Sequence, residues 1–399
     1  MDKSILKEIS RFFLGIYKTT FLLVLLVCFN LATTYILQPA AYAANQAQEP
    51  YKSAILMEAE SGRILFEKNM HESLPSASMT KMMLMLIVME KLQEGTFRLD
   101  DKIMISAEAS RIGGSQVYLK EGEIFTLEEL MQAIAIHSAN DACYAVAEHI
   151  IGQPEFFVDA MNEHAAKLGM KDTHYYTIHG LPSADGKKDD VTSAYDSTIL
   201  ARKLIEYPKL MEWTSTKEAT FRDGKFILRN TNKLIGKYRG ADGLKTGFYS
   251  KAGFNLTATA KRGDTRLIAV VMGALSNQGR TKEVAKLFDM GFNLYHRKVI
   301  LKKGQPFNQD VPIIDGTERT IKPVAAKDLV VYLKRNEFDK VTVGLAEVPT
   351  LKAPLKAGQE VSKIVARVGN EQASMIPGLC PEDIPEAGIL RKMFRKIFK

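Results

Sequence analysis

Cysteine and tryptophan are scarce in this 399-residue chain, which has three cysteines and one tryptophan. Only Cys143 and Cys380 lie beyond the N-terminal segment, too few for a disulfide framework. We therefore expect both to be structural residues, with Cys143 buried on a helix. The seven histidines show no metal-ligand spacing, and there is no His-Glu-x-x-His motif. We predict neither a metal nor a cofactor.

Low-complexity segments and fixed-period repeats are also absent. The glycine and proline contents are ordinary, and 46% of the residues are hydrophobic. A chain of this length and composition can bury a full core and is typical of two folded units.

The last nine residues contain no acidic side chain. The apolar residues of GILRKMFRKIFK fall in two rows spaced by four, and the other face carries five cations: Arg391, Lys392, Arg395, Lys396 and Lys399. The whole chain has a net charge of +8, but its globular part has little excess of basic residues. A nucleic-acid-binding protein would spread such residues over a folded face, so we expect no nucleic-acid partner. Residues 382–399 instead predict an amphipathic helix on a membrane surface, the alternative being an ordinary packed helix.

The N-terminus has the pattern of an export signal. Four basic residues precede the apolar run FLLVLLVCFNLATTYIL, and Ala41-Tyr42-Ala43 follows it. This predicts a signal peptide over residues 1–43, with a retained transmembrane anchor as the alternative. Either reading places the bulk of the chain outside the cytoplasm.

Strand patterns lie at both ends of the region 44–300, and helix patterns lie between them. KSAILMEAESGRILFEKN predicts two strands around a turn, and FNLTATAKRGDTRLIAVVMGAL predicts a hairpin around Arg262-Gly263-Asp264. We expect one α/β unit whose sheet is formed by the two ends of this region and flanked by helices. LEELMQAIAIHSANDACYAVAEHI is expected to be helical. Short alternating runs such as DLVVYLK and SKIVARVG predict a small all-β domain over residues 301–381.

One predicted helix is apolar nearly all round, yet it begins with Ser78 and carries Lys81 one turn later. Residues i and i+3 share a helix face, so the two side chains can touch. Burial on an apolar helix lowers the pKa of a lysine, which could then act as a base toward the serine hydroxyl. Taken alone the pair favours a capped helix start with a snorkelling lysine over a catalytic pair, because Ser-x-x-Lys also occurs at Ser4 and Lys7.

Two further motifs follow in the order expected of penicillin-binding proteins and class A β-lactamases: Ser138-Ala139-Asn140, then Lys245-Thr246-Gly247. Together with PSASMTK, LGMKDTHYYTIHGL, KAGFNL and VMGA, they make the chain resemble the low-molecular-mass serine D-alanyl-D-alanine carboxypeptidases. This resemblance runs from about Tyr51 to the C-terminus. It implies the α/β fold of the β-lactamase and transpeptidase type, followed by the small all-β domain and the C-terminal amphipathic helix.

The resemblance also implies roles for individual residues. Ser78 would be the nucleophile and Lys81 its base, with Lys245 as a second cation that further lowers the pKa of Lys81. Ser138 would pass a proton to the leaving amine. The residues implied to bind substrate are Asn140, Lys245, Thr246, Gly247, Phe248 through its backbone N–H, and Arg280, which would hold the terminal carboxylate.

Two positions depart from the family pattern. Relatives often have His or Tyr followed by Thr where this chain has Phe248-Tyr249, and some have Arg where it has Tyr195. His137, beside Ser138, is interpreted as a packing residue.

The predicted activity is removal of the terminal D-alanine from peptidoglycan pentapeptides, with β-lactams as covalent inhibitors, at the periplasmic face of the cytoplasmic membrane. A D,D-endopeptidase would use the same groups. A class A β-lactamase would need a Glu-x-x-Leu-Asn loop, which the sequence lacks between Asp141 and Gly243. A zinc D,D-peptidase would need clustered ligands, and a catalytically silent wall-binding protein would not need the complete set of motif residues.

Overall fold

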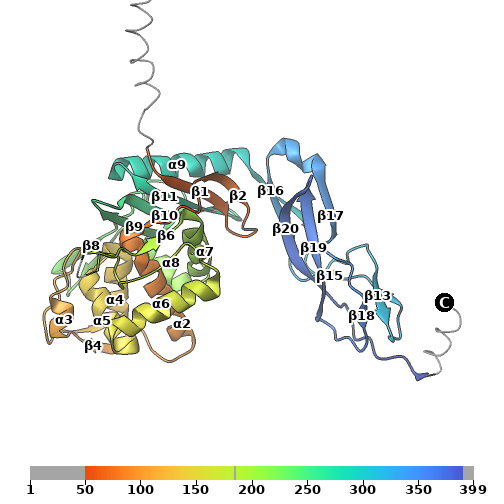
Figure 1. Ribbon diagram of the computed structural model, residues 1–399, viewed down its shortest axis with the longest axis horizontal. Helices are drawn as coiled ribbons and strands as arrows, with labels where there is room; N and C mark the ends of the chain where they lie inside the picture. Colours follow the sequence, from red (N-terminus) through yellow and green to blue (C-terminus); the bar gives the residue numbers. More distant parts are fainter. Residues whose placement is uncertain (1–49, 184–185, 390–399) are drawn as a thin grey trace, which may run out of the picture. The chain divides into compact units, whose positions relative to one another are not determined.

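The computed structural model describes residues 50–183 and 186–389 (Figure 1). The predicted signal peptide and residues 390–399 of the predicted C-terminal helix lie outside the described residues. Residues 382–388, predicted to belong to that helix, are not helical, and Ile384 forms a β-bridge with Leu355. Within the described ranges, no helix is both long and apolar enough to cross a membrane.

A five-stranded antiparallel sheet is the centre of the first domain, with the strand order β2-β1-β11-β10-β9. Its strands are β1 (Ser53–Glu58), β2 (Ile64–Lys68), β9 (Ala241–Tyr249), β10 (Gly253–Arg262) and β11 (Thr265–Ala274). Strand β1 pairs with β11, so the two ends of the domain meet in the sheet, as the sequence predicted. The predicted hairpin is β10–β11.

Helices cover both faces of this sheet (Figure 1). Helix α9 (Asn277–Leu294) packs on one face, where Phe288 and Val284 meet side chains of β1, β10 and β11. The other face carries the larger core, which is built around α2 (Lys81–Gln93). The remaining helices are α3 (Ala107–Ser110), α4 (Leu127–Gln132), α5 (Asn140–Ile151), α6 (Pro154–Leu168), α7 (Ala194–Leu204) and α8 (Pro208–Ser215). Every residue of α2 from Lys81 to Met89 is buried, which explains why this helix is apolar on all sides.

The helical stretch predicted over residues 127–151 is not one helix. Helix α4 passes into a π-helical turn, η2 (Ala133–His137), and the chain then breaks at Ser138 before α5 begins. Ser138 has a left-handed backbone with φ of 69°. The break turns a helical sequence into a corner, and the corner carries one of the predicted catalytic side chains.

Short two-stranded pairs complete the first domain: β3 (Leu74–Pro75) with β6 (Val191–Thr192), β4 (Lys102–Met104) with β5 (Ile124–Thr126), and β7 (Glu218–Phe221) with β8 (Phe226–Arg229). The β3–β6 pair anchors the chain just ahead of the predicted nucleophile.

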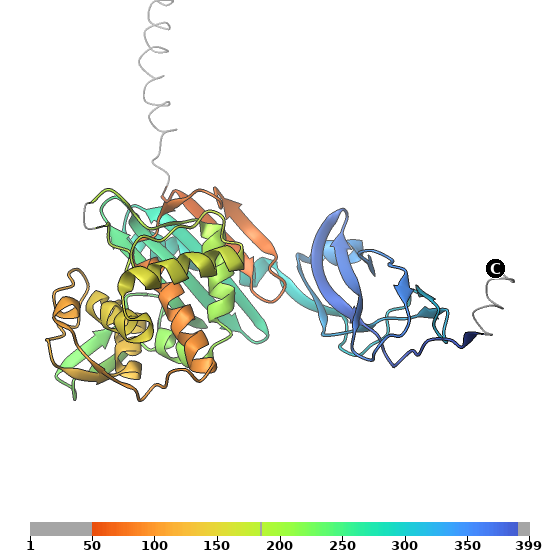
Figure 2. The same cartoon turned by 60° about the horizontal axis from the view of Figure 1, so that its bottom comes forward.

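The second domain is built of strands, as predicted (Figure 2). It has its own apolar core. Its strands are β12 (His296–Leu301), β13 (Val311–Ile314), β14 (Thr320–Ile321), β15 (Val324–Ala325), β16 (Leu329–Leu333), β17 (Val341–Leu345), β18 (Leu351–Lys352), β19 (Glu360–Val368) and β20 (Glu371–Leu379). Strand β12 pairs with β16, which brings the start of this domain to about His296, a few residues before the predicted boundary.

Candidate active site

Ser78 lies in a short 3₁₀ turn, η1 (Ala77–Thr80), which leads directly into α2. The residue before it, Ala77, has a positive φ of 48°, an uncommon conformation for a residue with a side chain. The loop that carries Gly180 packs tightly against this turn, because a Cβ atom built at Gly180 would stand 2.0 Å from the carbonyl oxygen of Ala77. The nucleophile thus lies in a constrained turn. The neighbouring loop can pack so closely against that turn only because it has a glycine at position 180.

The serine and lysine predicted to work together are in direct contact. The Nζ atom of Lys81 lies 2.8 Å from Oγ of Ser78, and it also donates a 2.7 Å hydrogen bond to the carbonyl oxygen of His179. Lys81 is fully buried, while Ser78 is partly open to solvent. A base on the inner side and solvent on the outer side are what a serine nucleophile needs.

Burial lowers the pKa of Lys81 to about 8, because the charged ammonium is poorly solvated among the apolar side chains of α2. The more distant Asp190 and Asp141 partly oppose this shift. Burial is the only influence that lowers the pKa of Lys81, so the expected contribution of Lys245 to that shift is not found. The charge interaction between the two lysines affects the pKa of Lys245. That pKa is lowered first by burial and second by the charge of Lys81. A charge on Lys81 therefore disfavours a charge on Lys245.

The corner at Ser138 meets strand β9 through Lys245. Its Nζ atom lies 2.8 Å from Oγ of Ser138 and 3.1 Å from the carbonyl oxygen of Thr246. Thr246 in turn donates a 2.8 Å hydrogen bond from its hydroxyl to that of Thr231. Two hydroxyl–lysine pairs, Ser78 with Lys81 and Ser138 with Lys245, thus stand in one site.

Asn140 begins helix α5 and is almost completely buried. Its Nδ2 atom donates a 2.7 Å hydrogen bond to the carbonyl oxygen of Gly113, but its Oδ1 atom has no hydrogen-bond partner among the described residues. A buried polar atom without a partner is costly, and a ligand can relieve that cost. The geometry is compatible with the predicted contact to a substrate amide.

Gly247 lies where β9 passes the nucleophile turn. A Cβ atom there would stand 2.5 Å from the carbonyl oxygen of Ser76, so the close approach of two backbones requires a glycine. Asn255 of β10 completes this junction by donating to the carbonyl of Pro75 (2.8 Å) and accepting from the backbone N–H of Gly273 (2.7 Å). These contacts fix the turn of Ser78 against the sheet.

Arg280 is buried beneath β9 and β10. Its Nη1 atom donates to the carbonyl oxygens of Gly247 (2.9 Å) and Asn255 (2.8 Å), and its Nε atom donates to Asn277 (3.1 Å). Burial lowers the pKa of Arg280 to about 10. Nη2 makes no hydrogen bond to any described residue, so one edge of the guanidinium remains for a ligand. The sequence suggested a carboxylate ligand, and the structure adds a role in supporting the strand.

The residues that depart from the family pattern form contacts of their own. Phe248 is 51% exposed and stacks on Phe254 with ring centroids 4.1 Å apart. The hydroxyl of Tyr249 donates to Asp189 at 2.5 Å, which joins the end of β9 to the loop before β6. Tyr195 packs against His71, with ring centroids 4.8 Å apart.

His137 stacks edge-on against Phe226, as expected for a packing residue. Cys143 and Cys380 are free and buried, which agrees with structural roles, and burial raises the pKa of the Cys143 thiol to about 12. Within the described ranges no group of histidine, cysteine and acidic side chains could hold a metal ion.

Sequence reasoning missed three residues that build the site. Asp190 accepts hydrogen bonds from Thr80 and from the backbone of Tyr176 and Thr177, so it joins the start of α2 to the loop carrying His179. Thr231 and Asn255 were also missed. Nothing local marks these residues, because each acts on a segment distant in the sequence.

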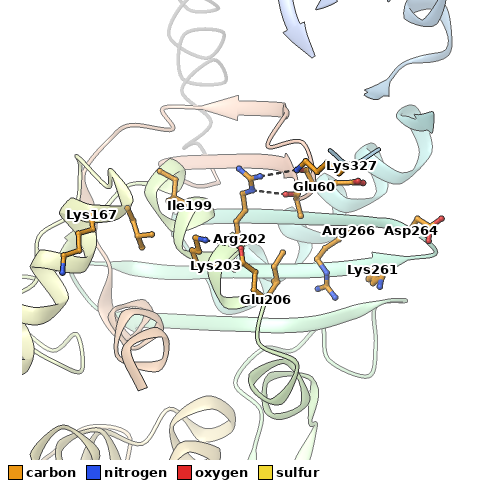
Figure 3. A pocket seen from close by; sticks show the side chains of 13 residues that line it. Glu60, Lys167, Ile199, Arg202, Lys203, Glu206, Lys261, Asp264, Arg266 and Lys327 are labelled. Carbon is orange, nitrogen blue, oxygen red and sulfur yellow. Dashed lines mark hydrogen bonds and ion pairs between the residues drawn. The ribbon is translucent and has the colours of Figure 1, made fainter. Parts of the chain in front are cut away.

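Another cavity lies at the opposite end of the sheet, beside the β10–β11 turn, and has a volume of about 760 Å³. Figure 3 shows its charged lining, which includes Arg202, Lys203, Glu206 and Arg266. Arg202 is already bound to the carbonyl oxygens of Ala59 and Glu60, and Arg266 pairs with Asp242. No serine or cysteine is among the residues that line it, so the arrangement around Ser78 remains the candidate active site.

Comparison with known proteins identifies the family. Residues 40–276 match the family model described as D-alanyl-D-alanine carboxypeptidase, and residues 295–386 match the C-terminal domain of penicillin-binding protein 5. The chain belongs to the D-alanyl-D-alanine carboxypeptidase family. The carboxypeptidase DacF of Bacillus subtilis is 37% identical over 343 residues, which cover 85% of this chain and 87% of that protein. DacC of Escherichia coli is 32% identical and covers 91% of this chain and 92% of its own length.

Solved structures of the carboxypeptidase family share the fold. Penicillin-binding protein 5 of Haemophilus influenzae matches with a TM-score of 0.75 and 30% identity, covering 85% of this chain and 98% of that one. Penicillin-binding protein D2 of Listeria monocytogenes, solved in an ampicillin-bound form, matches with a TM-score of 0.56 and 31% identity over 61% of this chain and 97% of its own. The predicted fold class is confirmed, apart from the C-terminal helix, of which residues 390–399 lie outside the described residues. The predicted activity, a serine D-alanyl-D-alanine carboxypeptidase, is also confirmed, and the alternatives are not favoured.

Proposed function

We propose that Ser78 attacks the peptide bond between the two terminal D-alanines of a peptidoglycan pentapeptide. Neutral Lys81, 2.8 Å from the hydroxyl, takes its proton. The C–N bond then breaks, the penultimate D-alanine stays on Ser78 as an ester, and the terminal D-alanine leaves as the amine. Ser138, held by Lys245, passes a proton to that amine. Water then hydrolyses the ester and frees Ser78. The contact between a buried lysine and a partly exposed serine is the observation that carries this mechanism.

Two groups of the substrate, its terminal carboxylate and the amide before the scissile bond, are proposed to fix its orientation in the site. The terminal carboxylate lies beside Lys245, Thr246 and the free Nη2 edge of Arg280. The amide that precedes the scissile bond lies beside Asn140, whose Oδ1 atom lacks a partner among the described residues. The backbone N–H groups of Ser78 and Phe248 would hold the developing oxyanion. The peptide chain thus runs from β9, past Ser78, toward Asn140.

β-Lactams are proposed to acylate the same serine, as expected from the ampicillin-bound and cefotaxime-bound forms of the Listeria relative. We further propose that residues 1–43 direct export, that the C-terminal segment holds the enzyme on the outer face of the cytoplasmic membrane, and that the β-domain is a spacer toward the wall. The support for this location is the charge and apolar pattern of the sequence.

Labelling with a fluorescent penicillin tests the central proposal. The wild-type chain should become labelled and should release one D-alanine per pentapeptide. Ser78→Ala should abolish both, and Lys81→Ala should come close to doing so, because the hydroxyl then has no base. Covalent labelling that persists in Ser78→Ala would show that another residue is the nucleophile.

A further inference from the structure

The two donors of the proposed oxyanion hole come from segments that lie far apart in the sequence. One is the backbone N–H of Ser78 in the turn η1, and the other is that of Phe248, near the end of β9. Both N–H groups must reach one oxygen atom, and hydrogen bonds weaken once the donor–acceptor distance leaves the range of about 2.7–3.2 Å. The contacts that hold these two segments together therefore bear directly on the reaction.

Strand β9 lies at the edge of the five-stranded sheet, where among the described strands it pairs with β10 alone. The contacts of Gly247 and Asn255 fix the nucleophile turn against the sheet just before Phe248 is reached. The last residues of β9, Phe248 and Tyr249, have no strand on their outer side. Their position on that side depends on side-chain contacts.

Asp190, directly before β6, is bonded to the chain on both sides of the nucleophile. Its backbone carbonyl oxygen accepts hydrogen bonds from the N–H (2.9 Å) and the hydroxyl (3.1 Å) of Ser76, and its Oδ2 atom accepts from the hydroxyl of Thr80 (2.9 Å). The carboxylate also accepts from the backbone of Tyr176 and from the backbone and hydroxyl of Thr177. A carboxylate has about four lone-pair sites, and all are used here. Asp190 is 2% exposed and cannot shift without breaking this set of bonds.

The neighbouring residue, Asp189, is bonded to the end of β9. The hydroxyl of Tyr249 donates to its Oδ1 atom at 2.5 Å, and Lys251 donates to its Oδ2 atom. Burial, together with the bond to Asp189, raises the pKa of Tyr249, so the hydroxyl stays protonated and remains a donor. The Lys251 side chain is 70% exposed, and an ion pair of that kind contributes little. The bond from Tyr249 is therefore the main connection between Asp189 and β9.

We propose, on the basis of the proposed function, that Asp189 and Asp190 form a clamp that sets the distance between the two oxyanion donors. Asp190 holds the turn of Ser78, and Asp189 holds the end of β9 through Tyr249. Consecutive Cα atoms are about 3.8 Å apart, so the two halves of the clamp cannot move independently. The clamp residues do not touch the substrate and are positioning residues. A loosened clamp weakens binding of the oxyanion in the transition state and leaves binding of the intact β-lactam unchanged.

Tyr249→Phe tests the clamp in the full chain, because it removes the hydroxyl and keeps the ring. The rate of penicillin acylation at saturation should fall about tenfold, which is less than the loss of about 10²–10³-fold caused by removing an oxyanion donor outright. The dissociation constant of the non-covalent penicillin complex should not change. Asp189→Asn still offers an acceptor to Tyr249 and should stay within about twofold of the wild type. Tyr238→Phe is the matched control, since it deletes a tyrosine–aspartate hydrogen bond elsewhere, to Asp289 at 2.7 Å, and should change neither quantity.

A thiono-β-lactam, in which sulfur replaces the carbonyl oxygen, reports on the spacing of the two donors. The C=S bond is longer and sulfur is a weaker acceptor, so the wild type should be acylated more slowly by this compound than by the oxygen compound. Tyr249→Phe should slow the sulfur compound by less than the oxygen compound, whereas a general loss of structure would slow both equally. Asp189→Ala should match Tyr249→Phe, and the double variant should be no slower than either, because both changes break the same bond.

The outcomes separate the clamp from the proposed function. An unchanged acylation rate in Tyr249→Phe would refute the clamp, and so would an equal slowing of both β-lactams or a similar loss in Tyr238→Phe. A double variant slowed by the product of the single effects would refute it as well, because the two side chains would then act separately. Failure of the proposed function looks different: the wild type itself would neither carry penicillin on Ser78 nor release D-alanine. Slower labelling of Tyr249→Phe that reaches the final level of the wild type shows that the variant is folded and its nucleophile intact.

Discussion

Arg280 offers a test in which two roles of one side chain can be measured separately. Its Nη1 atom supplies the hydrogen bonds to two buried carbonyls, Gly247 and Asn255. Each buried acceptor left without a partner costs about 1–3 kcal/mol, so Arg280→Ala should lower the free energy of unfolding by about 2–6 kcal/mol. Domains usually have about 5–15 kcal/mol of stability, and we expect the variant still to fold at 25 °C.

The second role is binding of the substrate carboxylate by Nη2. A charge-assisted hydrogen bond contributes about 1.5–3 kcal/mol, which corresponds to a loss of about tenfold to 150-fold in kcat/KM for a peptide with a free terminal carboxylate. A peptide whose terminus is a carboxamide lacks that bond, so Arg280→Ala should lower its turnover much less.

The assay compares both peptides in the wild type and in three variants, together with urea unfolding. Arg280→Lys keeps the charge but loses the planar fork, and should recover part of the carboxylate discrimination and little of the stability. Lys282→Ala removes an exposed cation two residues along α9 and should change neither quantity. Equal losses for the acid and the amide in Arg280→Ala would refute carboxylate binding and leave only the support of β9.

Three further predictions concern the base, the nucleophile turn and the tail. Because the pKa of Lys81 is about 8 and only its neutral form accepts a proton, the rate of penicillin acylation should fall about tenfold per pH unit below pH 8 and level off above it. Gly180→Ala should slow acylation at least tenfold, because its Cβ would displace the loop whose His179 carbonyl holds Lys81. A chain truncated before Gly388 should be found in the soluble fraction when membranes are washed, and it should keep its activity on peptides.

Each of these has a clear contrary result. The range from roughly pH 6 to pH 8 lies below the pKa of Lys81, and an acylation rate that does not change over this range would exclude Lys81 as the base. Gly152→Ala is the control for the second prediction, since Gly152 also has a positive φ but has open space around it, and an equal loss there would make the effect one of backbone strain alone. If the truncated chain stays with the membranes, the anchor lies elsewhere.

Much of the fold could be predicted because its signals are local. The hairpin β10–β11 has strand-forming residues around an Arg262-Gly263-Asp264 turn. The sequence of α2 is apolar on all sides, which predicts that the helix is buried. The same holds for Ser78 and Lys81, which are three residues apart and share one turn. Their contact follows from helix geometry.

The rest depends on contacts between distant parts of the chain. The break at Ser138 interrupts a sequence with ordinary helix-forming residues, and the left-handed residue there meets Lys245, 107 residues further on. Asn255 acts on Pro75 across 180 residues. A single sequence does not reveal such pairings. For the same reason the sequence gives no sign that Gly247, whose role in substrate binding stays a prediction, is also the point where two backbones approach closely.

The pairing of Asn255 with the segment before Ser78 has a consequence for the order in which the protein becomes active during its synthesis. The nucleophile and its base are made early, but β9, β10 and β11, against which their turn is fixed, begin about 160 residues later in the chain. A nascent chain that has not yet reached residue 255 lacks Asn255, and one that has not yet reached residue 274 lacks a complete β11 beside β10. Contacts of such long range also form slowly. The enzyme is therefore expected to gain its reactivity toward penicillin late and in one step, so that chains released prematurely should be inert to it.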